Sequence, residues 1–363
     1  LADLSGYSSS EEIQSVSDFN AAKEIAVTNS RVDGLEAKFN NFEAGAFSET
    51  TTASFSADFA VGAVDGKGIS TGVTDGDEDL QAGYGFQIDL NTSFTGEDSL
   101  DVSIDAGNGS GSLAEVGGGL ISGDGTENLT VDGVSYTFPV GDKMTAFVGD
   151  NTDASLLYST ACVYGGPGDT LDDCGARMAA LGTGSGTAAG ASYDIGNGFT
   201  AAVGYSGSGS TTSGLLTQEG DDEYGAQLSY AADSYGASIS YAMIETVGVD
   251  TTYWALNGYF TPTEAAGFPS ISVGFEAGDP EAAALDDTTQ YFVGLQWDEM
   301  GPGTLGVAMG TDGAFADNVD EFFVYEAFYS YPVNDGMTIT PYVWINEEAA
   351  TSTDDTGIAV VTT

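Results

Sequence analysis

The sequence predicts an all-β membrane protein: a sixteen-stranded antiparallel transmembrane β-barrel preceded by a short N-terminal helical coiled-coil stalk. Two observations support this fold class. From residue 50 to residue 363, short segments alternate apolar residues with small or polar ones, and the connections between them are long and short in turn. Such alternation puts the two sets of side chains on opposite faces of a strand. Short turns at one rim and long loops at the other are typical of a barrel that crosses a bilayer.

The second segment shows the alternation clearly, with Phe86 and Ile88 on one face and Gln87 and Asp89 on the other. We place sixteen such segments along the chain. They are residues 51–64, 80–94, about 100–105, 129–140, 144–149, 187–195, 199–206, 223–232, 235–246, 252–261, 270–277, 288–299, 303–309, 322–333, 337–346 and 356–363. Together they form a predicted barrel domain over residues 50–363.

The connections decide between a barrel and a soluble β-sandwich, because a sandwich shows the same alternation. Residues 196–198 and 334–336 are examples of tight, hairpin-like turns. The long polar loops are residues 65–79, 107–128, 150–186, 207–222 and 310–321. Two connections depart from the rhythm, since residues 261–269 are longer and residues 247–250 shorter than it predicts.

A helical pattern precedes the barrel. No proline occurs between residues 18 and 44, Ser17 or Asp18 can cap the start of a helix, and Gly45 can end it. We predict a coiled-coil stalk over residues 18–47, with an amphipathic helix packed on its own barrel as the alternative. The predicted oligomerisation seam has heptad spacing and consists of Ile25, Thr28, Val32, Leu35, Phe39 and Phe42. Residues 1–17 are acidic and serine-rich, which predicts a flexible leader.

The charge balance argues against several functions. The chain has 56 acidic residues, 6 basic residues and no histidine. So negative a chain is not expected to bind nucleic acid. Without histidine it cannot build Ser-His-Asp or Cys-His catalytic groups or the usual zinc sites. Carboxylate pairs of the glycosidase kind can be drawn anywhere in it and are uninformative. We therefore predict no enzymatic activity and no cofactor.

Three motifs resemble the outer-membrane porins of cyanobacteria, which are relatives of the carbohydrate-selective OprB porins. They run from Arg31 to Lys38 before the first strand, from Asp89 to Gly96 across the second hairpin, and over residues 193–199. The resemblance covers residues 30–363 and implies a trimeric sixteen-stranded barrel with a coiled-coil stalk. It also implies an S-layer-homology domain that grips peptidoglycan. That domain is not recognisable between the leader and the stalk, so peptidoglycan binding by this route is not predicted.

The longest connection, residues 150–186, lies between the fifth and sixth segments, where sixteen-stranded porins fold a loop into the lumen. It contains both cysteines, Cys162 and Cys174. Twelve positions apart in a chain without histidine, they suit a disulfide within the loop better than a metal site. Such a bridge would contribute ~3 kcal/mol if its effect is mainly on chain entropy. Two free thiols are the alternative.

The predicted pore is acidic, because Lys67, Lys143 and Arg177 are the only basic residues of the barrel region. The predicted pore-lining and constriction residues are Asp58, Asp89, Asp101, Asp105, Asp298, Asp169, Asp172, Asp173 and Arg177. Carboxylates around a narrow aqueous path concentrate cations and repel anions. This pattern favours a weakly cation-preferring diffusion pore. For each carboxylate, a solvated charge at a strand end or in a loop is the alternative.

Two acidic clusters in the loops offer oxygen ligands of the kind that Ca²⁺ and Mg²⁺ prefer. One consists of Asp75, Asp77, Glu78 and Asp79, and the other spans residues 219–223. Neither spacing matches an EF-hand, so we interpret them as regions of diffuse screening by loosely bound Ca²⁺ or Mg²⁺.

Taken together, these features predict an outer-membrane diffusion channel for small solutes and ions. An even number of strands puts both ends of the barrel at the short-turn rim, so the stalk is expected on the periplasmic side. The predicted partners are two further copies of the chain, outer-membrane lipid and lipopolysaccharide. The alternative is a secreted, acidic all-β adhesin or surface-layer protein with calcium-binding loops.

Overall fold

The structure, a computed structural model, describes most of the predicted barrel domain. The described residues are 50–65, 80–108, 127–168, 171–180, 186–209, 214–217, 220–246, 248–263, 267–282, 284–311, 313–317, 319–347 and 354–363. The predicted leader, the helical stalk with its seam, and the acidic group at residues 75–79 lie outside them.

Within these ranges the structure has sixteen strands of eight or more residues, which match the sixteen predicted segments in order. They are β1 (Thr51–Asp65), β2 (Gln81–Thr92), β3 (Ser99–Gly107), β4 (Thr130–Val140), β5 (Met144–Thr152), β6 (Gly186–Gly196), β7 (Phe199–Gly207), β8 (Asp222–Ala231), β9 (Tyr235–Thr246), β10 (Val249–Phe260), β11 (Ser270–Pro280), β12 (Thr288–Met300), β13 (Gly303–Thr311), β15 (Phe323–Asn334), β16 (Met337–Asn346) and β17 (Asp355–Thr362). The two-residue β14 (Phe315–Ala316) lies in a predicted loop and pairs with the start of β12.

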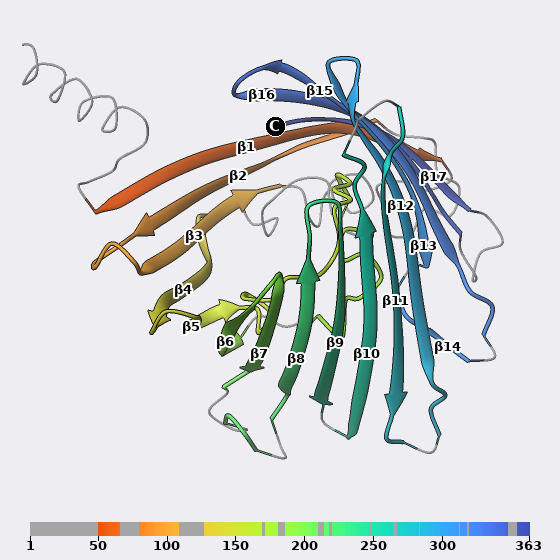
Figure 1. The fold of residues 1–363 in the computed structure, drawn as a ribbon. Helices are drawn as coiled ribbons and strands as arrows, with labels where there is room; N and C mark the ends of the chain where they lie inside the picture. Colours follow the sequence, from red (N-terminus) through yellow and green to blue (C-terminus); the bar gives the residue numbers. More distant parts are fainter. Residues whose placement is uncertain are drawn as a thin grey trace, which may run out of the picture. The chain divides into compact units, whose positions relative to one another are not determined.

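The sheet closes on itself as an antiparallel barrel (Figure 1). Each long strand pairs with the next one along the chain, and β1 pairs with β17, with Phe59 opposite Thr362 and Asp65 opposite Thr356. Closure leaves no unpaired sheet edge, which is what a strand-built membrane protein requires. Residues 54–363 form one compact unit.

Strand boundaries differ from the predicted ones by up to three residues, as at the ends of β5 and β11 and at the start of β10. Strand β10 starts at Val249, three residues before the predicted segment. Its first residue pairs with Thr246, the last of β9, so residues 247 and 248 alone connect the two strands. Gly248 has a φ of +107°, a conformation that glycine adopts without steric cost. The tight turn therefore lets β10 pair with β9 from Val249 onward, a start that the alternation in the sequence did not indicate.

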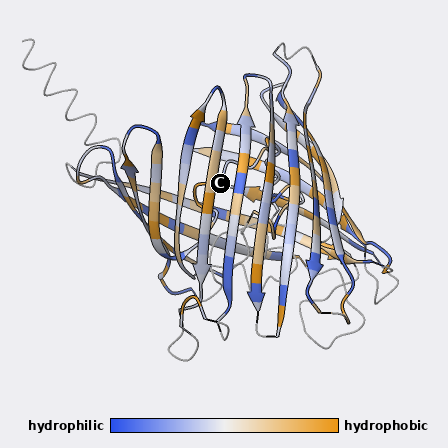
Figure 2. Cartoon of the chain, turned by 60° about the horizontal axis from the view of Figure 1, so that its bottom comes forward, coloured by the Kyte–Doolittle hydropathy of each residue, from blue (hydrophilic) through white to orange (hydrophobic). Residues whose placement is uncertain are grey.

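The outer face of the barrel exposes many large apolar side chains, and Figure 2 shows apolar residues spread along the strands. Trp254, Leu256 and Ile358, on two separate strands, expose 53%, 57% and 59% of their surface. A soluble protein rarely leaves so much apolar surface in water, whereas a bilayer covers it. No helix within the described ranges is long and apolar enough to cross a membrane.

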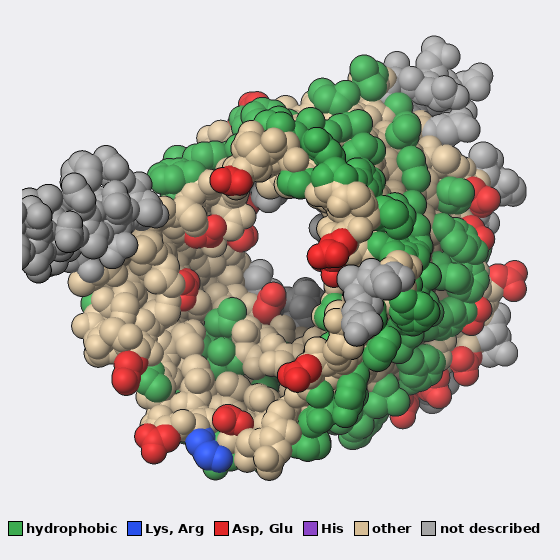
Figure 3. Space-filling model, turned by 45° about the horizontal axis from the view of Figure 1, so that its top comes forward, with side chains coloured by type: hydrophobic (Ala, Val, Ile, Leu, Met, Phe, Trp, Pro, Cys, Tyr) green, Lys and Arg blue, Asp and Glu red, His purple; other side chains and the backbone are tan. Residues whose placement is uncertain are grey.

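The inner face carries small and polar side chains instead. On β9, Ser238, Ser240 and Ala242 are buried inside the barrel, while Ile239 and Tyr241 alternate with them on the outer face. Seen from the end, the molecule has an opening through its interior with acidic side chains at the edge (Figure 3). The barrel thus has an apolar exterior and an interior lined by small and polar side chains.

Candidate functional site

The long connection between β5 and β6 folds into the barrel. We call residues 153–180 the inner loop; all of it is described except residues 169 and 170. In Figure 1 it is the yellow-green segment within the ring of strands. Its contacts are with side chains that strand alternation places on the inner face, which are described strand by strand below.

The outgoing part of the inner loop binds the inner faces of β8 and β9 through its backbone. The amide of Ser159 donates to Oε1 of Gln227 at 2.6 Å, and the amide of Ala161 donates to Oγ of Ser238 at 2.9 Å. Because these loop amides belong to no strand or helix, the wall side chains supply the partners that buried backbone groups need.

The tip of the loop reaches β11 and β12. The amides of Val163 and Tyr164 both donate to Oγ of Ser272, at 3.0 and 3.2 Å. The amide of Gly165 donates to Oε1 of Gln296 at 3.0 Å. Five amides of the loop thus bind side chains of β8, β9, β11 and β12, on either side of β10 in the barrel.

The Tyr164 side chain is the main anchor of the loop tip. Its hydroxyl donates to Oε1 of Glu326 on β15 at 2.5 Å, and the hydroxyl of Tyr342 on β16 donates to Oε2 of the same carboxylate at 2.8 Å. The Tyr164 ring lies 5.4 Å from the ring of Phe292 and 5.9 Å from that of Phe328. Burying an aromatic ring of this size stabilises the contact by roughly 1.5–3 kcal/mol.

The returning part of the loop binds the wall again at β10 and β11. Nδ2 of Asn257 donates to the carbonyl oxygen of Cys174 at 2.9 Å, and the amide of Ala179 donates to Oε2 of Glu276 at 2.7 Å. The loop is therefore held along both of its limbs.

The disulfide joins these two limbs. Cys162 and Cys174 are bonded, with their Cα atoms 6.4 Å apart, which confirms the predicted bridge. Cys174 is fully buried against the wall. A cross-link at this position ties the anchored tip to the returning limb and limits how far either can move.

Glycines on the inner wall make room for the loop backbone. A Cβ atom at Gly274 on β11 would overlap the carbonyl oxygen of Cys174, and one at Gly204 on β7 would overlap that of Ala154. The fit at these two points requires the absence of a side chain. The loop therefore has one defined position on the wall.

The wall formed by β2 and β3 makes none of the hydrogen bonds described above with the described part of the inner loop, and we call it the uncovered wall; it carries three predicted carboxylates. Asp89 accepts hydrogen bonds from Gln87 at 2.8 Å and from Ser103 at 2.5 Å. Asp101 accepts from Asn91 at 2.6 Å and from Ser99 at 2.7 Å, and Asp105 accepts from Thr130 at 2.8 Å. These donors are neutral, so they orient the three carboxylates without cancelling their charge.

A polar cavity of about 440 Å³ separates this acidic wall from the start of the inner loop. Its lining residues are Asp101, Ser103, Asp132, Gly133, Ser135, Asn151, Thr152, Asp153, Ser155 and Leu156. Loss of hydration, and secondarily the Asp132 carboxylate, raise the pKa of Asp153 above the ordinary range. Of the three carboxylates on β2 and β3, Asp101 lines this cavity, in which a hydrated ion has room, whereas Asp105 is buried with 8% of its surface exposed.

The other predicted pore residues lie in different surroundings. Asp58 shares the inner face of β1 with the buried Ala60. Asp298 is exposed near the short-turn end of β12 and accepts from Gln296 at 2.6 Å. Asp172 and Arg177 are exposed on the inner loop. Asp169 lies outside the described residues.

Asp173 is partly buried between the loop and the wall. Its carboxylate accepts from the Gly175 amide at 2.8 Å and from Nε2 of Gln290 at 3.4 Å. Burial raises the pKa of Asp173, while these hydrogen bonds and the Arg177 charge oppose the rise. The structure thus separates Asp173, at the loop seat, from Asp172, whose side chain is exposed.

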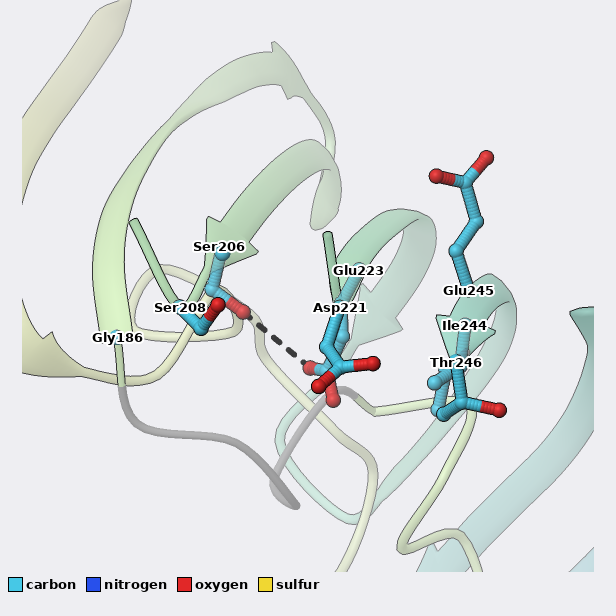
Figure 4. A pocket seen from close by; sticks show the side chains of 9 residues that line it. Gly186, Ser206, Ser208, Asp221, Glu223, Ile244, Glu245 and Thr246 are labelled. Carbon is cyan, nitrogen blue, oxygen red and sulfur yellow. Dashed lines mark hydrogen bonds between the residues drawn. The ribbon is translucent and has the colours of Figure 1, made fainter. Parts of the chain in front are cut away.

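A second cavity, of about 180 Å³, lies at the long-loop ends of β6 to β9 (Figure 4). Ser206 donates to Oε2 of Glu223 there at 3.3 Å, and the labelled Asp221 and Glu245 belong to the same lining. Among the described residues, no group of three or more His, Cys, Asp or Glu side chains is placed to hold a metal ion. The predicted acidic group at residues 75–79 is outside that search.

Sequence reasoning missed the residues that hold the inner loop, including Gln227, Ser272, Asn257, Glu276 and Glu326. They lie on inward faces, just as the acidic wall does, and alternation reports only the face. The available signal was a glycine opposite a loop carbonyl group at two places, Gly204 and Gly274. It has meaning only once the facing loop segment is known.

Comparison with known proteins supports the fold. No protein-family model matches the chain. An uncharacterized protein of Nostoc sp. is 34% identical over 131 residues, which is 32% of this chain and 22% of that protein. The chain therefore spans less than a quarter of the length of this relative.

Solved structures match over most of the barrel. The high-pH structure of Pseudomonas putida OprB has a TM-score of 0.59 at 10% identity and covers 85% of this chain and 93% of its own. An anion-selective porin from Comamonas acidovorans has a TM-score of 0.58 at 14% identity, covering 85% and 98%. A loop-deletion mutant of OmpT, an outer membrane protein of Vibrio cholerae, has a TM-score of 0.56 at 13% identity, covering 86% and 99%. The chain is thus similar in fold to outer-membrane porins.

Proposed function

We propose that the protein is an outer-membrane diffusion channel for small solutes and ions, with a weak preference for cations. Three features support it: the closed barrel, its apolar outer face, and an interior narrowed from one side by the inner loop. The acidic wall carries the proposal furthest. Asp89, Asp101 and Asp105 face the interior and are hydrogen-bonded to neutral groups.

The charge argument depends on what opposes these carboxylates. Of the basic residues of the barrel region, the structure describes Lys143 and Arg177. Lys143 lies in the β4–β5 turn with its ammonium group 6.0 Å from the centre of the Tyr193 ring. Arg177 lies on the loop, near Asp173. In a narrow aqueous path with low-dielectric walls, the excess negative charge raises the local concentration of cations.

We further propose that three copies assemble, with residues 18–47 as a periplasmic coiled-coil stalk. The heptad spacing of the seam and the resemblance of residues 31–38 to cyanobacterial porins support this part of the proposal. A trimer that dissociates only on heating in detergent is the expected behaviour. A soluble, monomeric protein stabilised by calcium would instead support the adhesin alternative.

Reconstitution tests the channel function. The protein purified in detergent should make liposomes permeable to small neutral sugars and should form ion-conducting pores in planar bilayers. Under a KCl gradient, the sign of the reversal potential should indicate K⁺ preference over Cl⁻, and the preference should weaken at high salt because screening shortens the range of the charges. Absence of conductance would contradict the channel function, and a Cl⁻ preference would contradict the selectivity.

A further inference from the structure

Two glutamates of the inner wall hold the loop, and they differ in how their oxygens are paired. Glu326 is 4% exposed, and each of its oxygens accepts from a tyrosine hydroxyl. Glu276 is 1% exposed, and its Oε2 accepts from the Ala179 amide. No donor of the described residues reaches Oε1 of Glu276. The backbone amide of Met178 also acts on this carboxylate, but an ionised Oε1 would be a buried oxygen without a partner, which is costly.

A second buried oxygen without a donor belongs to the side chain of Asn257 on β10. Asn257 is 5% exposed, and its Nδ2 donates to the carbonyl oxygen of Cys174. This bond fixes the orientation of the amide, so Oδ1 points the other way, and it too has no donor among the described residues. Two buried acceptor oxygens, one on β10 and one on β11, are therefore without a donor among the described residues.

The strand register makes the two side chains neighbours. Asn257 pairs with Gly274, and Glu276 pairs with Ala255, so Asn257 and Glu276 are diagonal neighbours on adjacent strands and point to the same face. Diagonal pairs of this kind are within reach of long side chains. Gly274 is directly opposite Asn257 and two positions before Glu276, and it carries no side chain.

We infer that Glu276 is a neutral carboxylic acid whose Oε1 hydroxyl donates to Oδ1 of Asn257, and that in this form it positions the returning limb of the inner loop. The acid then satisfies both oxygens, because Oε2 accepts from Ala179 while Oε1 carries the proton. Asn257 in turn fixes the position of the loop, because its amide nitrogen donates to the carbonyl oxygen of Cys174. This role concerns how the loop is held and is independent of the selectivity of the pore.

The surrounding charges fit a neutral acid. From the inner loop, the charged groups near this site are Asp173, which acts on Glu276, and the exposed Arg177, which acts on Asp173. On β10 the titratable neighbour is Tyr253, and on β12 the residue opposite Glu276 is the uncharged Gln290. Removing the proton would place two carboxylates and an unpaired amide oxygen under one loop segment.

The inference has a directional consequence for pH. The proton is present in acidic solution, where the returning limb is held. At alkaline pH the proton leaves to water, the Glu276–Asn257 hydrogen bond is lost, and the limb loosens. Protection of the loop amides should therefore fall as pH rises.

Infrared difference spectroscopy tests the protonation state directly in the folded, detergent-solubilised protein. At mildly acidic pH the wild type should show the carbonyl stretch of a buried protonated acid, which Glu276→Gln should lack. Glu326→Gln is the matched control and should leave that band in place, because Glu326 accepts from two hydroxyls. Identical spectra for the wild type and Glu276→Gln would overturn the inference. In that case water or a cation, and not a proton of Glu276, would have to join the two oxygens.

Amide hydrogen exchange at Ala179, corrected for the intrinsic pH dependence of exchange, tests the positioning role. Protection in the wild type should be lost at alkaline pH. In Glu276→Gln it should persist at all pH values, since the glutamine amide can donate to Asn257 without titrating. Glu276→Ala should lose protection at every pH. Equal pH dependence in the wild type and Glu276→Gln would contradict the positioning role even if all variants fold.

Discussion

The two sides of the barrel interior use similar residues for opposite purposes. On the wall covered by the inner loop, polar side chains such as Gln227 and Ser272 point inward and bind loop backbone. On the uncovered wall, Asp89 and Asp101 also point inward but bind small neutral neighbours in the sheet. The first set shapes the opening, whereas the second gives it charge.

This difference shows that an inward polar residue is not by itself a pore residue. The covered wall combines glycines, where the loop backbone approaches, with buried partners for its amides. The uncovered wall combines carboxylates with open space. Width and selectivity are therefore expected to change independently, and the predictions below change one wall at a time.

The largest effect is expected from filling the space that the loop occupies. Gly274→Leu would overlap the Cys174 carbonyl group and break its bond with Asn257. We expect the loop seat to lose about 3 kcal/mol, the upper end for overpacking. Single-channel conductance should rise as the loop leaves the wall. The control is Gly258→Leu, because a Cβ at Gly258 meets no atom closer than 3.5 Å. Unchanged conductance in Gly274→Leu would show that the loop does not narrow the opening.

Removing the disulfide should have the next largest effect. The bridge closes a loop of twelve positions, so replacing Cys162 and Cys174 by alanine should cost about 3 kcal/mol if its effect is on chain entropy. Proteolysis within residues 153–180 should become faster, whereas cleavage in the loops outside this segment should not change. Equal cleavage of the inner loop in both proteins would mean that the wall contacts alone hold it.

Tyr164→Phe should weaken the tip anchor while keeping the ring. Its hydroxyl is one of the two that pair with Glu326, and the buried oxygen left without a donor should cost about 2 kcal/mol. Larger fluctuations of single-channel current are the expected readout. Tyr193→Phe is the control, because Tyr193 is 46% exposed on the outer face. Current noise that is the same in both variants would argue against this anchor.

A smaller effect is expected on the uncovered side, where no loop is involved. Asp98 in the β2–β3 turn accepts hydrogen bonds from Tyr136, Thr95 and Ser93, which hold the pKa of its carboxyl well below the ordinary range. A lowered pKa stabilises the fold above the unfolded-state value, and this contribution is lost only as pH falls through the folded-state value.

Asp98→Asn should therefore lower stability, by the same amount at neutral and at mildly acidic pH, without changing conductance. The heat-induced dissociation temperature in detergent measures it. A difference from the wild type that vanishes at mildly acidic pH would contradict the low pKa.

The fold was predictable because alternation is local. The two faces of each strand can be read from a few consecutive residues. The sixteen predicted segments match the sixteen long strands of the structure in order, with boundaries within three residues. The disulfide was predictable for a similar reason, since Cys162 and Cys174 lie in one connection. The start of β10 at Val249 was not, because pairing through Gly248 extends the strand beyond its alternating part.

The division of the interior into two walls was not predictable. It depends on contacts between residues far apart in the chain, such as Tyr164 with Glu326, 162 positions apart. Alternation gave Gln296 and Asp101 the same description, yet one binds the loop and the other lines the cavity. The roles predicted for Asp58, Asp298, Asp172 and Arg177 in the pore stay predictions.

The variant Asp89→Asn/Asp101→Asn/Asp105→Asn tests the central claim most directly, through reversal potentials in a KCl gradient compared with those of the wild type. We expect the wild type to prefer K⁺ and the variant to lose most of that preference, while liposome permeability to neutral sugars stays the same because the inner loop is untouched. An unchanged reversal potential in the variant would contradict the assignment of selectivity to the uncovered wall.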